Sequence, residues 1–327
     1  MKSLLKSSRA WICLTVLIGG LFGCVGPAPS PASPGEPAAA PVAEQAPASA
    51  PLEIAVIPKG LAHQFWLTVK AGAEAAGKEL GAEIIWQGPA KETEIAKQIN
   101  IVEDMISREV DAIVLAACDE NALIQKVQQA LDAKIPVVTM DSGVKSDLPF
   151  SFVATDNVAG ARLAADTLAG LIGDQGMVGV IPFVAGAATS EMREQGFKEG
   201  IAQHPNIALG PVLYCDSDVA KAMNVTNDML TANADLRGIF ATNEPAAIGA
   251  AQALKTAGKA GTVKLVAFDG AEEEIAALKE GAIQALVVQN PYKMGYESVK
   301  AAVDAIHGKE VPKRIDTGVT VVTADNL

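Results

Sequence analysis

The sequence holds few of the side chains from which metal sites and nucleophilic active sites are built. Among 327 residues there are three histidines and four cysteines, and aromatic residues make up 4% of the chain. The histidines, His63, His204 and His307, stand far apart and take part in neither an HExxH nor a CxxC pattern. The chain also lacks a GxSxG elbow and a Walker phosphate loop. We therefore predict that the protein is not an enzyme and binds no metal and no cofactor.

Basic residues are outnumbered as well. The chain has 26 Lys and Arg against 38 Asp and Glu, which gives a formal net charge of −12. Nucleic-acid-binding proteins present basic patches, and adhesion to anionic lipid also needs clusters of basic residues. The composition therefore argues against nucleic acid as a partner and against general adhesion to membranes.

The apolar run near the N-terminus, residues 10–22, has 13 residues, whereas a membrane-spanning helix needs about 20. It follows three basic residues and ends in Leu21-Phe22-Gly23-Cys24, which resembles a bacterial lipobox. We predict that residues 1–23 are a signal peptide and that Cys24 is lipidated, the alternative being an ordinary cleaved signal with an incidental cysteine. Residues 24–50, rich in Pro and Ala, predict an extended tether. The folded part is expected in the periplasm or another extracytoplasmic space, held at the membrane by lipid only.

Two cysteines, Cys118 and Cys215, remain for the folded part. They could pair in an oxidising compartment, but they are expected in different halves of the fold, so we predict two unpaired thiols. A reactive cysteine needs a basic neighbour that lowers the pKa of its thiol. Asp119 and Asp216 are the neighbours here, and they act in the opposite direction.

From Leu52 onward, short apolar runs alternate with helical patterns, and half of all residues are hydrophobic. This alternation predicts parallel sheets covered by helices on both faces. One helix is expected over Glu92 to Arg108, and another is expected to begin at Asp119 as its cap. The roughly 277 residues after the tether exceed a usual single core. We therefore predict an α/β fold with two doubly wound parallel-sheet lobes and a ligand cleft between them.

Polar residues directly follow the strands of the unit Gly238–Gly270, which reads as strand, helix and strand. The crossover makes the two strands parallel, so Asn243 and Asp269 are expected at the same edge of a sheet. Ligands in open α/β sheets bind beyond the carboxyl ends of the strands. Each residue has a purely structural alternative: Asn243 could cap the next helix, and Asp269 with Glu272 resembles a capping box.

Further polar or aromatic side chains follow other predicted strands. They are Lys59, His63, Phe65, Trp66, Asp141, Arg193 and Gln289. Carboxylate, amide and guanidinium groups offer two hydrogen-bonding partners in a fixed geometry, which the neighbouring hydroxyls of a sugar ring require. Phe65 and Trp66 could cover the C–H face of a sugar, although packing at a helix start is an alternative. Arg193 could instead be an exposed helix charge.

Seven stretches, in the expected order, resemble the ribose/allose/galactose class of periplasmic sugar-binding proteins, the substrate-capture subunits of ABC sugar importers. They are IAVIPKGLAHQFWLTVK (54–70), PVVTMD (136–141), TDN (155–157), ATSEMREQGF (188–197), IFATNEPAAIGA (239–250), VAFDG (266–270) and VQNPYKMG (288–295). The resemblance covers residues 52–327. It implies that every strand-end residue named above is a sugar ligand, except His63. His63 and Gln64 stand where the family usually has Asn-Pro. Ser217 replaces the family's usual aromatic residue of the second lobe, so aromatic contact with the sugar is expected from one side only.

The resemblance also implies three hinge crossings, near 155–156, 289–290 and 316–317. Lobe 1 would then comprise residues 51–155 and 290–316, and lobe 2 residues 156–289 and 317–327. It implies a monomer that captures a pentose or hexose and delivers it to an ABC permease in the inner membrane. The alternatives are a sugar receptor that feeds a sensor kinase or chemoreceptor, and the sensing core of a lactose-repressor-type regulator, for which no helix-turn-helix is found.

Overall fold

The computed structural model describes residues 23, 26, 28 and 50–327. Cys24 lies outside these residues, and so do the predicted signal peptide and tether, apart from residues 23, 26, 28 and 50. Residues 50–327 belong to one compact unit. Within the described part of the chain, no helix combines the length and the apolar character that a membrane span would need.

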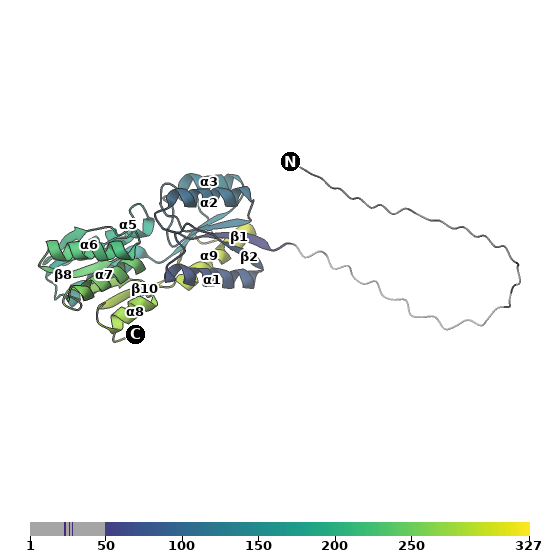
Figure 1. The fold of residues 1–327 in the computed structure, drawn as a ribbon. Coiled ribbons are helices and arrows are strands. Elements are labelled where there is room, and N and C mark those ends of the chain that lie inside the picture. The colour runs from purple at the N-terminus through teal and green to yellow at the C-terminus, as the bar shows by residue number, and fades with distance from the viewer. Residues whose placement is uncertain (1–22, 24–25, 27, 29–49) are drawn as a thin grey trace, which may run out of the picture. The chain divides into compact units, whose positions relative to one another are not determined.

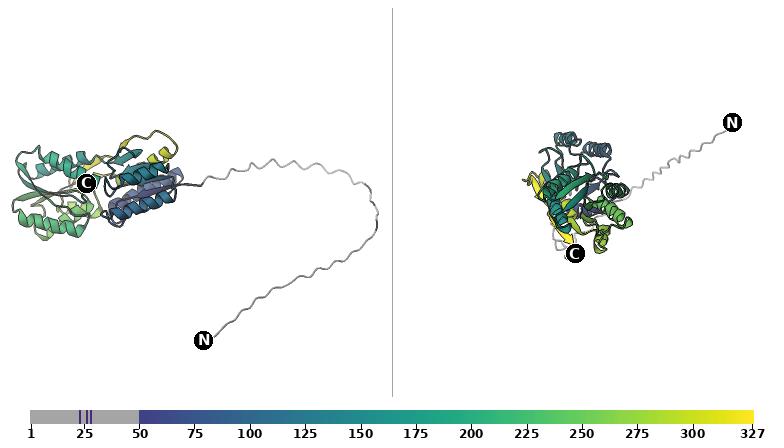
Figure 2. Two further views of the ribbon diagram at one scale, coloured as in Figure 1. Left: turned by 90° about the horizontal axis from the view of Figure 1, so that it is seen from above. Right: turned by 90° about the vertical axis from the view of Figure 1, so that its left-hand side faces the viewer.

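Two six-stranded sheets organise this unit (Figures 1 and 2). The first sheet has the order β11-β5-β4-β3-β1-β2, and its described pairs are all parallel. Its strands are β1 (Leu52–Ile57), β2 (Ala82–Trp86), β3 (Ala112–Leu115), β4 (Val137–Met140), β5 (Ser151–Ala154) and β11 (Arg314–Asp316). We call this sheet with its helices lobe 1.

The second sheet has the order β12-β10-β9-β8-β6-β7. Its strands are β6 (Gly176–Ile181), β7 (Ile207–Val212), β8 (Leu236–Ala241), β9 (Lys264–Phe268), β10 (Ala285–Gln289) and β12 (Val319–Thr323). β12 runs antiparallel to β10, whereas the other described pairs are parallel. This sheet with its helices is lobe 2, and the predicted α/β fold with two parallel-dominated sheets is confirmed.

Helices cover both faces of each sheet because the strands are apolar on both sides. In lobe 1, Ile54 and Val56 of β1 pack with α1 (Gln64–Leu80) and α9 (Pro291–Ile306). Ala55 and Ile57 point to the other face and pack with α2 (Ile95–Ser107) and α3 (Ile124–Asp132). Successive side chains of a strand point to opposite faces, so a doubly covered strand reads as a continuous apolar run.

Lobe 2 repeats this arrangement. One face packs with α4 (Asn157–Leu171) and α5 (Ala188–Ile201). The other face packs with α6 (Val219–Ala232), α7 (Glu244–Thr256) and α8 (Glu272–Lys279). In β8, Phe240 belongs to the first face and Ile239 to the second.

The helices α1 and α9 approach each other at two glycines. A Cβ atom on Gly72 would lie 2.0 Å from the carbonyl oxygen of Tyr292, and one on Gly295 would lie 2.0 Å from that of Val69. No larger residue fits at such distances without moving a backbone. Helix α9, which is yellow in Figure 1, therefore lies against the early helix α1, and both belong to lobe 1.

Two helix starts differ from the sequence prediction. The helix expected from Glu92 begins at Ile95, and the helix expected from Asp119 begins at Ile124. Asp119 Oδ1 instead accepts the backbone N–H groups of Asn121 (2.9 Å) and Ala122 (2.7 Å), so it caps a turn that precedes the helix. Aspartate side chains stabilise such turns in competition with the helix, and the sequence pattern does not distinguish the two.

The prediction of two unpaired thiols is confirmed. Cys118 lies in lobe 1 and Cys215 in lobe 2, and both are free and buried. Burial raises the pKa of each thiol to about 12. Neither cysteine therefore has the thiolate character that redox or nucleophilic chemistry needs.

Candidate functional site

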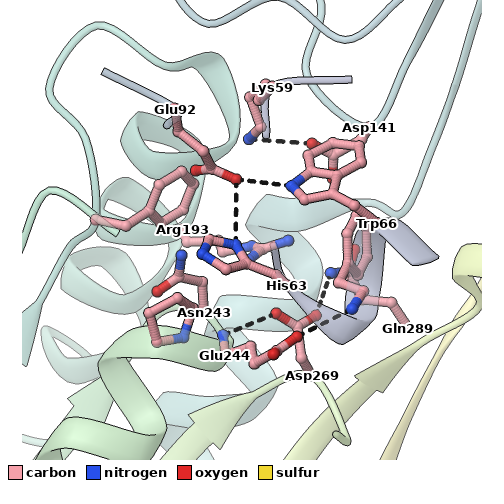
Figure 3. Close-up of a pocket in the computed structure, with 13 residues that line it drawn as sticks. Lys59, His63, Trp66, Glu92, Asp141, Arg193, Asn243, Glu244, Asp269 and Gln289 are labelled. Carbon is pink, nitrogen blue, oxygen red and sulfur yellow. Dashed lines mark hydrogen bonds and ion pairs between the residues drawn. The ribbon is translucent and has the colours of Figure 1, made fainter. Parts of the chain in front are cut away.

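A pocket of about 290 Å³ lies between the two lobes, at the carboxyl ends of the strands (Figure 3). All nine residues that the sequence analysis selected line it. The full lining is Lys59, His63, Phe65, Trp66, Glu92 and Asp141 from lobe 1, Phe183, Arg193, Asn243, Glu244, Pro245 and Asp269 from lobe 2, and Gln289 at the end of β10. Asp141 and Arg193 thus face a shared space from opposite lobes.

Two aspartates that directly follow strands have an unusual backbone conformation. Asp141 directly follows β4 with φ 53°, and Asp269 directly follows β9 with φ 84°. A residue other than glycine rarely adopts positive φ, and such conformations concentrate at functional sites. The sharp turn after each strand aims the carboxylate into the pocket.

Lys59 and Asp141 form a buried ion pair, with Lys59 Nζ 3.1 Å from Asp141 Oδ2. The same ammonium group donates a hydrogen bond of 3.0 Å to Thr189 Oγ1 of lobe 2. Burial acts to lower the pKa of Lys59, but the charges of Asp141 and Glu92 outweigh it, and the pKa is raised. The pocket therefore keeps a charged ammonium donor.

Arg193, on α5, is 2% exposed, so the alternative of an exposed helix charge is wrong. Its Nε donates to Asn157 Oδ1 (2.8 Å) and its Nη1 donates to the carbonyl oxygen of Thr242 (2.6 Å). The guanidinium carbon lies 3.9 Å from the centroid of the Phe268 ring. Burial lowers the pKa of Arg193 against the opposing charge of Asp269. These contacts fix the plane of the guanidinium group at the pocket wall.

Asn243 has the capping role that the sequence left open, and it also lines the pocket. Its Oδ1 accepts the N–H of Ala246 (3.1 Å), which caps α7, and its Nδ2 donates to Ser217 Oγ (2.8 Å). The side chain also lines the pocket. One amide therefore caps the start of a helix with its oxygen and forms part of the pocket wall.

Asp269 does not form the capping box that its spacing to Glu272 suggested. The N-cap of α8 is Ala271, whose N–H donates to Glu274 Oε2 (2.7 Å). Asp269 Oδ1 accepts Gln289 Nε2 (2.6 Å), and its Oδ2 accepts the N–H of Glu244 (3.1 Å). Burial raises the pKa of Asp269, and the guanidinium of Arg193 acts against this.

Aromatic side chains line the pocket from both lobes, whereas the sequence had indicated aromatic residues in lobe 1 only. Phe65 and Trp66 lie edge to face with centroids 5.0 Å apart in lobe 1. Phe183 comes from lobe 2, two residues after β6, and its ring centroid is 4.8 Å from Lys59 Nζ. The signal was available, because Phe183 follows a strand as the selected residues do. The family resemblance had instead directed attention to Ser217.

Glu92 is one of two buried acids of the pocket that the sequence analysis missed, and the other is Glu244. Its Oε1 accepts Trp66 Nε1 (2.9 Å) and lies 3.7 Å from His63 Nδ1, and its Oε2 accepts Ser217 Oγ of lobe 2 (2.7 Å). Burial acts to raise the pKa of Glu92, but Lys59 and His63 outweigh it, and the pKa is lowered. Within a charged stretch expected to be helical, nothing distinguished Glu92 from its solvent-exposed neighbours.

One buried acceptor atom of the pocket, Gln289 Oε1, has no hydrogen bond to any described residue. Buried polar atoms without a partner are rare and costly, so this position favours a ligand that donates a hydrogen bond. Among the described residues, no group of three or more His, Cys, Asp or Glu side chains could hold a metal ion.

Behind the pocket, Glu274 makes the stability of the fold depend on pH. It is fully buried, and its Oε1 has no hydrogen bond within the described residues. Burial raises the pKa of Glu274 well above its usual value, and the charge of Asp269 acts in the same direction. A carboxyl with a raised folded pKa contributes stability below its unfolded pKa of about 4.3 and loses it as pH rises through the folded pKa.

The free energy of unfolding of the wild type should therefore rise, relative to Glu274→Gln, as pH falls from about 8 to about 5. Urea unfolding at each pH measures this difference. Glu273→Gln, which changes an exposed neighbour, is the matched control and should follow the wild type. Parallel pH profiles for wild type and Glu274→Gln would contradict the expectation.

Comparisons with known proteins agree with this geometry. Residues 54–310 match the family model described as periplasmic binding protein domain. The D-ribose/D-allose-binding protein of Pseudomonas aeruginosa is 34% identical over 287 residues, which cover 83% of this chain and 88% of that protein. The ribose import binding protein of Salmonella typhimurium is 31% identical over 269 residues, which cover 82% of this chain and 90% of that protein.

Among solved structures, an ABC transporter solute binding protein from Agrobacterium vitis with bound D-fucose is 43% identical. The superposition has a TM-score of 0.82 and covers 84% of this chain and 96% of that one. The match to the family model spans both lobes. The chain therefore belongs to the periplasmic binding protein family.

Proposed function

We propose that the protein captures a monosaccharide, a pentose or hexose, in the pocket between its lobes, as the substrate-binding protein of an ABC sugar importer. The observation that carries this proposal is the ring of polar side chains, each with two hydrogen-bonding groups or atoms, that line one pocket from both lobes. The relatives reported above are named for ribose and allose, and one neighbour holds D-fucose.

The pocket offers acceptors and donors in the mixture that a sugar hydroxyl needs, since each hydroxyl both donates and accepts. Asp141, Asp269 and Gln289 Oε1 are acceptors, whereas Lys59 and Arg193 are donors. The rings of Phe65, Trp66 and Phe183 supply apolar surface for the C–H groups of the sugar.

Closure of the lobes is the proposed mechanism of capture. A ligand that contacts both lobes stabilises the closed form by its differential contacts. The chain passes between the sheets after β5, after β10 and after β11. These crossings support our proposed lobe boundaries, which are 51–155 with 290–316 and 156–289 with 317–327.

We also propose that residues 1–23 are a signal peptide, that Cys24 carries the lipid, and that the folded part acts as a monomer beside an inner-membrane permease. Support comes from the lipobox-like Leu21–Cys24 and from the named roles of the relatives. Because those relatives are binding proteins, we propose that the bound sugar leaves unchanged.

A thermal-shift screen over pentoses and hexoses, with ribose, allose and fucose included, tests the proposal. A ligand that binds only the folded state stabilises it by about 2.7 kcal/mol at 100 times its Kd. At least one monosaccharide should raise the melting temperature, and the same sugar should be recovered unchanged after incubation. Amino acids of similar size are the control. A screen in which amino acids stabilise and no sugar does would refute sugar capture.

A further inference from the structure

The N-terminus of α1, in lobe 1, is completed by a carboxylate of lobe 2. The first N–H groups of a helix have no partner within the helix. His63, the N-cap residue of α1, makes no side-chain hydrogen bond to them. Instead, the N–H of Gln64 donates to Glu244 Oε1 and the N–H of Phe65 donates to Glu244 Oε2, each at 3.0 Å. A carboxylate at this end of a helix is also favoured by the helix dipole.

A second contact runs in the opposite direction. The N–H of Glu272, the first residue of α8 in lobe 2, donates to Gln64 Oε1 of lobe 1 at 2.8 Å. The two lobes therefore exchange helix caps. We call these three hydrogen bonds, which involve Gln64, Phe65, Glu244 and Glu272, the cross-lobe caps.

The cross-lobe caps need the lobes to be together, because each joins a donor in one lobe to an acceptor in the other. Glu244 is held ready by its own N–H, which donates to Asp269 Oδ2 (Figure 3). Its side chain lines the pocket, but both of its oxygens are engaged by α1. Gln64 does not line the pocket and borders the neighbouring cavity at the rim.

We propose that Glu244 and Gln64 are positioning residues: they raise the affinity of the closed form for its ligand but do not contribute to selectivity between sugars. This inference rests on the proposed function. A contact made only in the closed form multiplies the apparent affinity for every ligand by the same factor, because it changes the closing equilibrium. Lys59, in contrast, also bonds across the lobes but presents its charge to the ligand.

Calorimetric titration of Gln64→Ala and Glu244→Gln with at least two sugars from the screen tests the proposal. For each sugar, the affinity should fall about tenfold in Gln64→Ala and about 10- to 100-fold in Glu244→Gln, with the ratio between sugars unchanged. Glu273→Gln removes the same charge from an exposed position in the first turn of α8 and should keep wild-type affinity. Unchanged affinity in both test variants would overturn the proposal, and so would a change in the ratio between sugars.

Amide exchange, measured with saturating sugar so that the lobes are closed, tests the caps directly. The N–H groups of Gln64 and Phe65 should exchange faster in Glu244→Gln than in the wild type, and Glu273→Gln should match the wild type. Equal exchange rates would overturn the cross-lobe caps even if sugar binding is established. A wild type that binds no monosaccharide refutes the proposed function, whereas sugar binding with equal exchange rates in wild type and Glu244→Gln refutes the caps alone.

Discussion

Asp269→Ala is expected to abolish monosaccharide binding, with a loss of affinity of about 100-fold or more. Asp269 is buried between Gln289 Nε2 and the N–H of Glu244, so its oxygens are held in place before the ligand arrives. Removing the carboxylate also takes away the opposing charge that acts most strongly on the buried guanidinium of Arg193. Both the ligand and the arginine therefore lose a partner in one step.

Titration calorimetry with the sugar found in the screen measures this loss. Asp269→Asn keeps the shape of the side chain and should also bind poorly, because its amide group faces donors where the carboxylate accepted. The sugar-free melting temperature of Asp269→Asn, measured beside the affinity, shows how far the same change destabilises the fold. Near-wild-type affinity in both variants would remove Asp269 from the site.

Asn243→Ala is expected to be harder to interpret than Asp269→Asn. The alanine loses contact with the pocket and also the cap of α7, which contributes about 1 kcal/mol. The loss of affinity in Asn243→Ala must therefore be compared with the loss of stability that urea unfolding of the same variant measures.

Gly295→Ala is expected to destabilise the folded protein by about 2–3 kcal/mol, the upper part of the range for overpacking. The new methyl group would lie 2.0 Å from the backbone oxygen of Val69, so α1 and α9 must move apart. Alanine has a better helix propensity than glycine, but this offsets only about 1 kcal/mol of the destabilisation. Gly72→Ala should behave in the same way, because its methyl group would meet the oxygen of Tyr292.

Urea unfolding measures these changes, and Gly170→Ala is the matched control. Gly170 lies in α4, is exposed, and a methyl group there would meet nothing within 4 Å. Alanine at this position should stabilise the protein by up to about 1 kcal/mol. A gain in stability for Gly295→Ala, as for Gly170→Ala, would show that the two helices are not closely packed.

The features that sequence predicts well in this protein are local. Continuous apolar runs such as Ile54–Ile57 indicate strands covered on both faces, and the residue after a parallel strand falls at the ligand edge. That rule selected Asp141, Asp269 and Gln289, and the structure places all three around one pocket. Their roles toward a ligand stay a proposal.

The features that sequence missed depend on contacts between distant segments. Glu92 and Ser217 are 125 positions apart, and they meet only because the lobes face each other. The cross-lobe caps join Gln64 to Glu244 over 180 positions. No local pattern carries such information. Phe183 is different, because it follows β6 and could have been selected by the same rule as Asp141.

The position of α9 in lobe 1 has a consequence for the order in which the chain is made. Strands β1–β5 leave the ribosome first, but the face of their sheet that α9 covers stays bare until residues 291–306 have been translated. Lobe 2 likewise waits for its edge strand β12. Neither half can reach its final packing early in synthesis. A nascent chain that completes its cores so late stays incompletely folded during synthesis. The proposed export across a membrane requires such an unfolded chain.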